Sequence, residues 1–416
     1  MTGAAGRGVR DDGLLRRQRR ALVLLAVAEL LAMSLWFSAS AVVPELEAAW
    51  ALEAGTAAWL TMSVQLGFVV GAVLSAALTL SDVWRPRTLF FGASLAGAAA
   101  TAAIAALARG PELALPLRFL TGMALAGVYP PGMKIMAGWF RERRGLAIGV
   151  LVGALTVGSA APHLLRVVGG IGAWRPVLWL AAGLAVVGGL LVLAVEEGPY
   201  QPAPASFDPS AVGRIVRDRA TMLANAGYFG HMWELYAVWT WIPLWLAAGF
   251  AVDGSRATGP AAAGLVAFAT IAVGGAGAWA AGAAADRLGR TRVTSASMVV
   301  SGACCLAAGA LFGASPWLVV PFCLLWGFAI VADSAQFSAC VTELAEPRYV
   351  GTALTLQTAV GFLLTVASIR LVPAWQEAWG WTWAFAPLAA GPALGTLAMQ
   401  LLRRLPEAER LAGGRG

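Results

Sequence analysis

The chain carries a succession of apolar runs, each close to the length that an α-helix needs to cross a bilayer. A spanning helix takes about 20 residues, so runs of this length predict transmembrane helices. Six runs precede a polar central stretch and six follow it. They cover residues 21–44, 58–80, 88–108, 112–138, 145–168, 175–195, 220–249, 259–284, 293–314, 317–341, 349–373 and 378–402. The sequence therefore predicts an all-α membrane protein with twelve transmembrane helices.

Composition also favours lipid over water as the solvent. Hydrophobic residues make up 59% of the 416 residues and charged residues only 12%, whereas a soluble domain has about 25% charged residues. The four cysteines fall within apolar runs and have no metal-ligand spacing with a histidine, so we expect free, packed thiols. We expect neither a metal nor another cofactor.

The arginines are concentrated in alternate loops. They fill the N-terminal tail, every second loop, the central stretch and the C-terminal tail. The intervening loops hold only Arg109, Arg175 and Arg256. By the positive-inside rule this bias places both termini in the cytoplasm, with the chain spanning the cytoplasmic (inner) membrane many times. The net charge of +7 is thus explained by topology, and we expect the lipid bilayer, not nucleic acid, as the partner.

The two halves of the chain repeat one another. Landmark residues recur at an offset of about 205 positions, a spacing that indicates a duplicated unit. The pairs are Glu29 with Glu234, Asp82 with Asp286, Gly122 with Gly327, and Gly145 with Gly351. We predict two six-helix bundles related by an axis along the membrane normal. The expected parts are tail 1–20, bundle 21–195, central loop 196–219, bundle 220–402 and tail 403–416, with loop and tails in the cytoplasm.

Ionisable residues interrupt the apolar runs, most clearly His231 and Glu234. An ionisable group in hydrocarbon is costly and usually faces a cavity or a partner. Three residues apart on a helix, these two side chains are neighbours on one face. Glu234 is followed by Trp241, as Glu29 is followed by Trp36. The pattern predicts a duplicated, charged interior.

A carboxyl group in such a place suits proton transfer, because low dielectric disfavours its ionised form. Glu234 is therefore the leading candidate for a proton carrier, with Glu29 and Asp333 as further candidates. His231 could relay or share that proton. The alternative for His231 is a neutral core histidine bonded to a helix carbonyl.

One loop resembles a motif of the major facilitator superfamily. Residues 282–290 read G-A-A-A-D-R-L-G-R and match that family's G-x-x-x-D-R-x-G-R loop between the second and third helices of a half. Residues 81–87 keep the acid and the arginines in the first half but lack the glycines. The resemblance implies a cytoplasmic gate that latches the halves together, whereas the alternative is that loop arginines only enforce topology. The implied gate residues are Asp82, Arg85, Gly282, Asp286, Arg287, Gly289 and Arg290.

Further segments extend the resemblance over nearly the whole chain. Arg118 and Gly122 match the family's R-x-x-x-G pattern on the fourth helix, and Gly149 with Gly158 loosely resembles its antiporter motif. Residues 122–165 are loosely similar to members classed with nitrate/nitrite porters. The anion-binding arginines of those porters are absent from runs 58–80 and 259–284.

In this family the first, fourth, seventh and tenth helices line a central cavity. The resemblance places most of the buried ionisable residues on these helices. The expected substrate-binding residues are Arg118, Lys134, Tyr228, Trp36 and Trp241. Lys134 could instead snorkel to the cytoplasmic interface, and Asp333 could pair with Lys134 or Arg118. The tryptophans and Tyr228 could be packing residues.

The resemblance implies a secondary active transporter that works by alternating access. We expect a proton-coupled transporter of a small solute and a monomer. Cations on the first half and acids on the second favour an anionic or zwitterionic solute. A proton-antiporting drug or metabolite exporter is the alternative, followed by a transporter-like membrane sensor. The sequence holds no phosphate-binding loop and no nucleophile–base arrangement, so we do not expect an enzyme.

Overall fold

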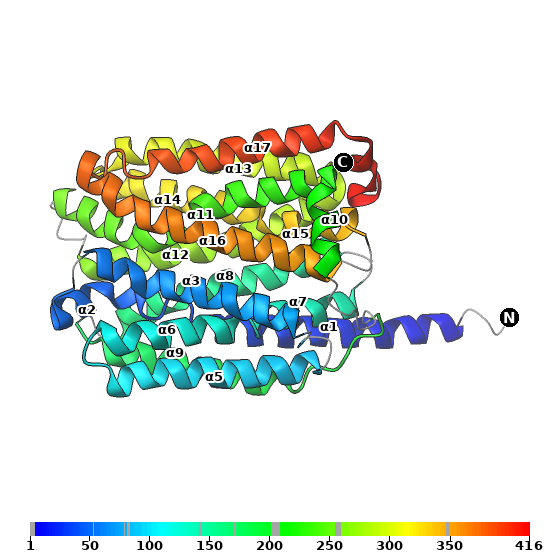
Figure 1. Cartoon of the computed structure of the whole chain (residues 1–416), viewed down its shortest axis with the longest axis horizontal. Helices are drawn as coiled ribbons and strands as arrows, with labels where there is room; N and C mark the ends of the chain where they lie inside the picture. Colours follow the sequence, from blue (N-terminus) through cyan, green and yellow to red (C-terminus); the bar gives the residue numbers. More distant parts are fainter. Residues whose placement is uncertain are drawn as a thin grey trace.

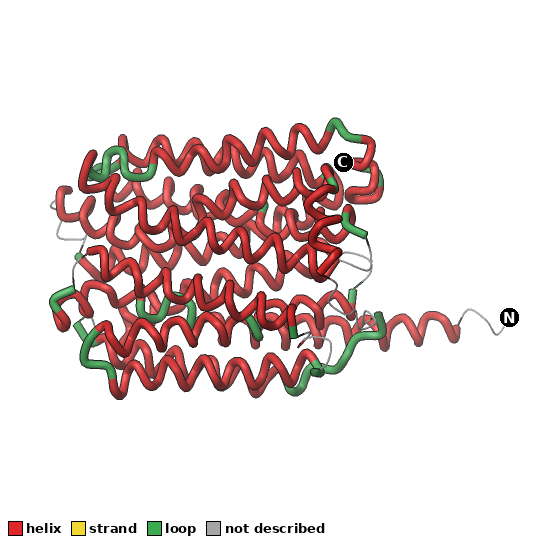
Figure 2. Tube along the Cα trace, viewed as in Figure 1, coloured by secondary structure: helices red, strands yellow, loops and turns green. Residues whose placement is uncertain are grey.

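The computed structural model describes residues 5–52, 54–78, 80, 84–140, 144–169, 172–200, 209–253, 259–346 and 350–416. Across these residues the chain is helical and holds no strand (Figure 2), as predicted. The predicted gate residue Asp82 lies outside the described residues.

The first half of the chain forms eight described α-helices that carry most of its length. They are α1 (Ala5–Met33), α2 (Val43–Trp50), α3 (Ala54–Ala77), α5 (Pro86–Leu107), α6 (Pro111–Leu125), α7 (Tyr129–Trp139), α8 (Arg144–Gly169) and α9 (Trp174–Val192), with the short 3-10 helix η1 (Ser40–Val42) before α2.

The second half begins after the polar central stretch. Its helices are α10 (Pro209–Arg217), α11 (Arg219–Asp253), α12 (Pro260–Leu288), α13 (Arg290–Ala307), α14 (Pro316–Ala332), α15 (Ser334–Leu344), α16 (Val350–Trp379) and α17 (Ala390–Arg403), with the 3-10 helices η2 (Ala308–Leu311), η4 (Ala386–Ala389) and η5 (Pro406–Gly413).

The long helices run side by side and gather into two groups, one from each half of the chain (Figure 1). Between the groups, α8 packs on α12 and α3 packs on α16. Both termini lie at the same end of the molecule (Figure 1). We call this the inner end and the opposite one the outer end, after the predicted orientation.

Ten described helices are long and apolar enough to cross a membrane. They account for every expected span except the first and the last. The expected span 21–44 is divided, because α1 ends at Met33 and the chain turns before η1 and α2. The expected span 378–402 holds η4 and the 14-residue helix α17. These two segments pack along neighbouring long helices, and their crossing of the membrane stays a prediction.

The fourth and tenth expected spans are each broken into two helices near their middle. Between α6 and α7 the break precedes Tyr129, which is followed by Pro130 and Pro131. Proline lacks the N–H that would continue the hydrogen bonds of the preceding helix, so it sits well in the first turn of a new one. Between α14 and α15 the break falls at Asp333. The breaks occupy equivalent places in the repeat and turn side chains toward the centre of the molecule.

Glycines of the repeat set the closest helix crossings within each half. A Cβ atom on Gly122 of α6 would lie 2.1 Å from the Val64 carbonyl oxygen of α3. A Cβ on Gly327 of α14 would lie 1.7 Å from the Thr270 carbonyl oxygen of α12. Small residues let helix backbones approach closely in lipid, where packing drives helix association. The paired glycines therefore serve the same purpose in both halves.

Gly122→Val should destabilise the protein, because two methyl groups would be forced into the backbone of α3. We expect a loss of about 1–3 kcal/mol in the free energy of unfolding, seen as a lower thermal unfolding temperature in detergent. Gly183→Val on α9 is the matched control, since no atom lies within 4 Å of its Cβ position. Equal unfolding temperatures for the two variants would contradict this assignment of the crossing.

Candidate functional site

A small central cavity lies between the two groups of helices. It encloses about 30 Å³, room for roughly one water molecule. The first half contributes Trp36, Tyr129, Val152, Leu155 and Thr156 to its wall, and the second half contributes Tyr228, Met232, Leu235, Tyr236, Trp239, Val331, Ser334 and Phe362. Among these described residues none is charged. The wall is apolar and aromatic, with a few hydroxyl groups.

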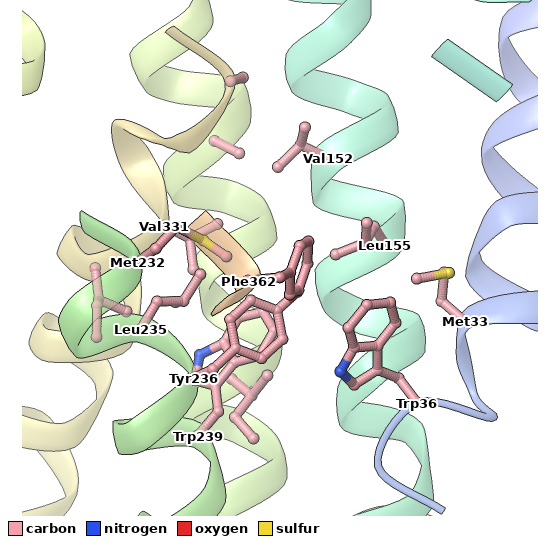
Figure 3. Close-up of a cluster of buried hydrophobic side chains, with 14 of the residues drawn as sticks. Met33, Trp36, Val152, Leu155, Met232, Leu235, Tyr236, Trp239, Val331 and Phe362 are labelled. Atoms are coloured by element: carbon pink, nitrogen blue, oxygen red, sulfur yellow. The ribbon is translucent and has the colours of Figure 1, made fainter. Parts of the chain in front are cut away.

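Aromatic rings join the two halves across this cavity. The Trp36 ring centroid lies 5.6 Å from that of Tyr236 and 5.2 Å from that of Phe362 (Figure 3). Such separations are favourable for tilted aromatic pairs. Similar contacts complete the group, which we call the aromatic cluster: Trp36, Phe37, Phe68, Tyr236, Trp239 and Phe362. The cluster closes the cavity in this conformation.

Arg118 lies behind the wall and holds Trp36 in place. It is fully buried, and its Nη1 donates to the Leu35 carbonyl at 2.9 Å and to Ser38 Oγ at 3.1 Å. Its other nitrogens donate to the carbonyls of Trp36 and, at 3.1 Å, Leu60. The carbonyls of Leu35 and Trp36 become available because α1 ends at Met33, whereas Leu60 belongs to α3. Arg118 therefore neutralises the broken end of α1, and it does not line the cavity.

Glu29 lies in the first half, one layer behind the cavity wall. Its carboxylate is fully buried and has no hydrogen-bond partner among the described residues. Gly132 of α7 makes room for it, since a Cβ there would lie 2.7 Å from Glu29 Oε2. Tyr129, one turn earlier on α7, interacts electrostatically with Glu29 and forms part of the wall. Only this turn of α7 separates the carboxylate from the cavity.

The other three predicted proton-coupling residues come together in the second half. His231 Nδ1 lies 2.9 Å from Asp333 Oδ1, and both side chains are buried. Asp333 also interacts electrostatically with Glu234. Asp333 sits at the α14–α15 break between two wall residues, Val331 and Ser334. The group therefore lies directly behind the wall, and the partner of Asp333 is His231, not Arg118 as the sequence allowed.

Glu234 points away from the cavity into the second half. Its carboxylate accepts hydrogen bonds from Ser301 Oγ at 2.6 Å and from Cys305 Sγ at 3.2 Å, both on α13. The sequence did not predict Ser301 and Cys305 as partners of Glu234, because they lie 67 and 71 residues away along the chain. The cysteine was predicted only as a packed thiol. All four cysteines are indeed free and buried.

The remaining predicted substrate-binding residues are dispersed. Tyr228 and Trp36 line the central cavity. Trp241 lies nearer the outer end and donates its Nε1–H to the Ile369 carbonyl at 2.9 Å. Lys134 is half-buried on α7 and is not part of the cavity wall. The wall residues that sequence reasoning missed include Tyr129, Tyr236 and Phe362.

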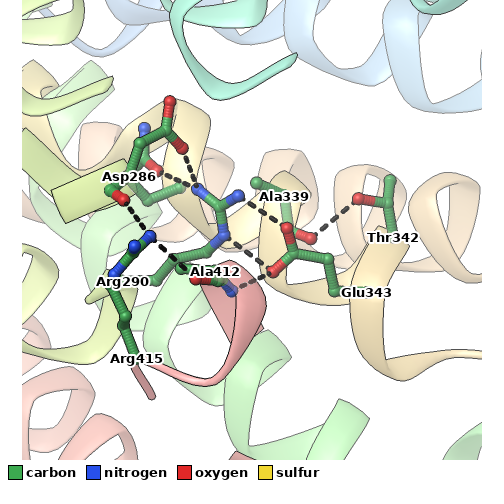
Figure 4. Close-up of polar contacts among 8 residues, drawn as sticks. Asp286, Arg290, Ala339, Thr342, Glu343, Ala412 and Arg415 are labelled. Carbon is green, nitrogen blue, oxygen red and sulfur yellow. Dashed lines mark hydrogen bonds and ion pairs between the residues drawn. The ribbon is translucent and has the colours of Figure 1, made fainter. Parts of the chain in front are cut away.

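The predicted gate forms a cluster of charges at the inner end. Arg290 donates two hydrogen bonds to Glu343, at 2.8 and 2.6 Å, and a third to Gln336 Oε1 at 2.7 Å (Figure 4). Asp286 Oδ1 lies 3.7 Å from Arg290 Nη1. The structure thus places Glu343 and Gln336 beside the predicted gate residues. Neither was predicted, because both belong to α15, far along the chain.

This cluster touches the other half through α8. A Cβ on Gly145, at the start of α8, would lie 2.7 Å from Asp286 Oδ1, and a Cβ on Gly282 would lie 3.0 Å from the Gly145 carbonyl oxygen. Further along the same helices, a Cβ on Gly149 would lie 2.8 Å from the Ala278 carbonyl oxygen. The backbones of α8 and α12 therefore meet at the inner end.

The C-terminal segment packs against the same cluster. The Ala412 N–H donates to Glu343 Oε2 at 3.0 Å, and Arg415 Nη1 donates to the Asp286 carbonyl at 2.8 Å (Figure 4). Gly289 has a φ of +98°, and a Cβ there would lie 2.3 Å from the Arg415 carbonyl oxygen. Gly289 is therefore required for two reasons: its positive φ disfavours other residues, and a side chain would clash with Arg415. The predicted gate residues Arg85 and Arg287 are exposed.

Comparison with known proteins agrees with this architecture. The family model described as Major Facilitator Superfamily matches residues 25–369. The chain is also similar to a chloramphenicol resistance protein of Streptomyces lividans, with 32% identity over 167 residues. The aligned part covers 39% of this chain and 41% of that protein, so the similarity spans less than half of either.

Arg290→Ala should open the inner end, because it leaves Glu343 and Asp286 without their buried cation. Arg292→Ala is the matched control, since Arg292 is exposed on the same helix. The measurement is labelling of Val152→Cys, a cavity residue, by an impermeant maleimide applied to the inner end after the native cysteines are replaced. We expect severalfold faster labelling with Arg290→Ala than with Arg292→Ala. Equal rates would remove Arg290 from the gate.

Proposed function

Because the chain belongs to the Major Facilitator Superfamily, we propose that it is a secondary active transporter that exports small, uncharged aromatic solutes in exchange for protons. The observation that carries the proposal is the central cavity between the two halves. Its wall combines aromatic rings with hydroxyl groups and, among the described residues, no charge. In the proposed orientation the inner end faces the cytoplasm and the membrane is the cytoplasmic membrane, as the arginine distribution indicates.

The wall favours an uncharged solute for a physical reason. Moving a charge out of water into a low-dielectric site is costly unless a partner neutralises it, and the described wall residues offer no such partner. Rings such as those of Trp36, Tyr236 and Phe362 stabilise an aromatic solute by stacking or edge contacts. Hydroxyls of Tyr129 and Ser334 can bond its polar groups. The partial similarity to a chloramphenicol resistance protein supports the same class, since chloramphenicol is an uncharged aromatic amide.

The anionic or zwitterionic solute expected from the sequence stays a prediction with less support. It depended on Arg118 and Lys134 facing the solute. Arg118 donates to four oxygen atoms of the first half, and Lys134 is not a wall residue in this conformation. The similarity to nitrate/nitrite porters is unsupported for the same reason, because the wall presents no arginine.

We propose that the buried ionisable residues behind the wall of the central cavity couple transport to protons. Glu29 lies behind Tyr129 in the first half, and the His231–Asp333 pair with Glu234 lies behind the wall in the second half. A carboxylate without a partner is costly in hydrocarbon. We therefore propose that Glu29 carries a proton while the inner end is closed and releases it to the cytoplasm when that end opens to admit the solute.

A transport assay separates this function from a sensor that binds without moving its ligand. In inside-out vesicles the inner end faces the bath. Radiolabelled chloramphenicol should accumulate inside these vesicles when their lumen is acidic, and a protonophore should abolish the accumulation. Vesicles without the protein give the passive background. Binding to the purified protein without accumulation would support the sensor, and accumulation of organic anions alone would support the anionic alternative.

Glu29→Gln should uncouple the transporter, because glutamine keeps the shape of a protonated carboxyl but cannot release a proton. We expect gradient-driven accumulation to fall to background while counterflow exchange between solute on both sides persists. Glu112→Gln is the matched control, since Glu112 is exposed at the start of α6. Glu234→Gln tests the second-half group in the same assay. Normal accumulation with both Glu29→Gln and Glu234→Gln would overturn the proposed coupling.

A further inference from the structure

A second and larger pocket lies between the two halves near the outer end. Its volume is about 260 Å³, close to the lower limit of about 300 Å³ for small-molecule sites. The first half contributes residues of η1, α2, α3 and α8, and the second half contributes residues of α11 and α12. None of its lining residues lines the central cavity. We call it the outer pocket.

The aromatic cluster separates the outer pocket from the central cavity. Trp239 belongs to the cavity wall, whereas the next two residues on α11, Thr240 and Trp241, line the outer pocket. On the other half, Trp36 lines the cavity and Ser40 lines the pocket. Phe37, which stands between Trp36 and Ser40 in the chain, meets Trp239 with 5.9 Å between the ring centroids.

The central cavity is too small for an organic solute in this conformation, whereas the outer pocket has room for one. At the inner end, the backbones of α8 and α12 are in contact. A solute bound to this state would thus occupy the outer pocket. This is the arrangement expected after the solute has passed the aromatic cluster and before it leaves.

The outer pocket combines an apolar body with one strong donor. Pro44, Trp241 and Leu244 offer apolar surface, and Arg166 is its charged lining residue. Arg166 Nε donates to Glu45 Oε1 at 2.8 Å, and the two side chains are 12% and 7% exposed. This bond uses one N–H of the guanidinium, which has several. Glu45 offsets the charge, so the pocket suits an uncharged acceptor better than an anion.

We propose that the outer pocket is a second binding site for the same uncharged aromatic solutes, an inference that rests on the proposed function. The solute places its rings against Trp241 and Leu244 and accepts a hydrogen bond from Arg166 with a carbonyl or nitro oxygen. The aromatic cluster then acts as the partition that the solute crosses between the two sites.

The test is protection of a single cysteine by the solute. Thr240→Cys, in the protein without its native cysteines, is labelled from the outer end with an impermeant maleimide, with and without chloramphenicol. We expect chloramphenicol to slow labelling of Thr240→Cys and to leave Val252→Cys unchanged, because Val252 lies on α11 outside the pocket and is exposed. Unchanged labelling of Thr240→Cys at a concentration that saturates transport would overturn the proposal.

Two further variants assign the site. Arg166→Lys keeps a cation beside Glu45 but loses the planar fork of donors, so half-protection should need at least about tenfold more chloramphenicol. Val152→Trp fills the central cavity and should abolish transport while leaving protection of Thr240→Cys intact. Loss of protection with Val152→Trp would mean that chloramphenicol acts only from the central cavity, which would also overturn the proposal.

The outcomes separate this inference from the proposed function. Transport without protection of Thr240→Cys leaves export standing and removes the outer site. Protection without transport keeps the outer site as a place where an uncharged aromatic compound binds, and it removes export as the protein's activity.

Discussion

Every polar group inside the hydrocarbon needs a partner within the protein, because lipid offers none. This constraint explains the most specific contacts of the structure. Where α1 ends at Met33, the freed carbonyls of Leu35 and Trp36 bind Arg118. The broken helix and the buried arginine therefore depend on each other, and together they hold Trp36 at the cavity. In the second half, Ser301 and Cys305 satisfy Glu234 in the same way.

The contacts at the inner end differ in kind from those between the two pockets. At the inner end, glycines bring the backbones of α8 and α12 into contact, and Arg290 binds Glu343 beside them. These contacts are directional, so they hold one geometry. Toward the outer end, aromatic rings lie between the cavity and the outer pocket. Ring contacts tolerate several geometries, which suits the proposed role of the aromatic cluster as a partition.

The two halves share their helix packing but differ in the surroundings of their buried acids. Gly122 and Gly327 serve equivalent close crossings, and both halves break their fourth helix near the centre. The acids at equivalent positions differ: Glu29 has no described hydrogen-bond partner and Glu234 has two. A symmetric scaffold thus carries an asymmetric set of charges, which fits the proposed role of Glu29 as the proton carrier.

Features that depend on the order of residues along the chain were predictable from the sequence. The all-helical class, the ten helices long and apolar enough to cross a membrane, and the glycines at close helix crossings follow from hydropathy, spacing and the demands of backbone geometry. The first and last expected spans were less secure, because α1 breaks at Met33 and α17 is short.

The partners of buried polar groups depended on the tertiary structure. Which oxygen atoms Arg118 meets, whether Asp333 faces His231, and whether Lys134 reaches the cavity are set by which helices are neighbours and how each is rotated. Hydropathy does not determine that rotation, so only the packed structure decided which side chains line the central cavity.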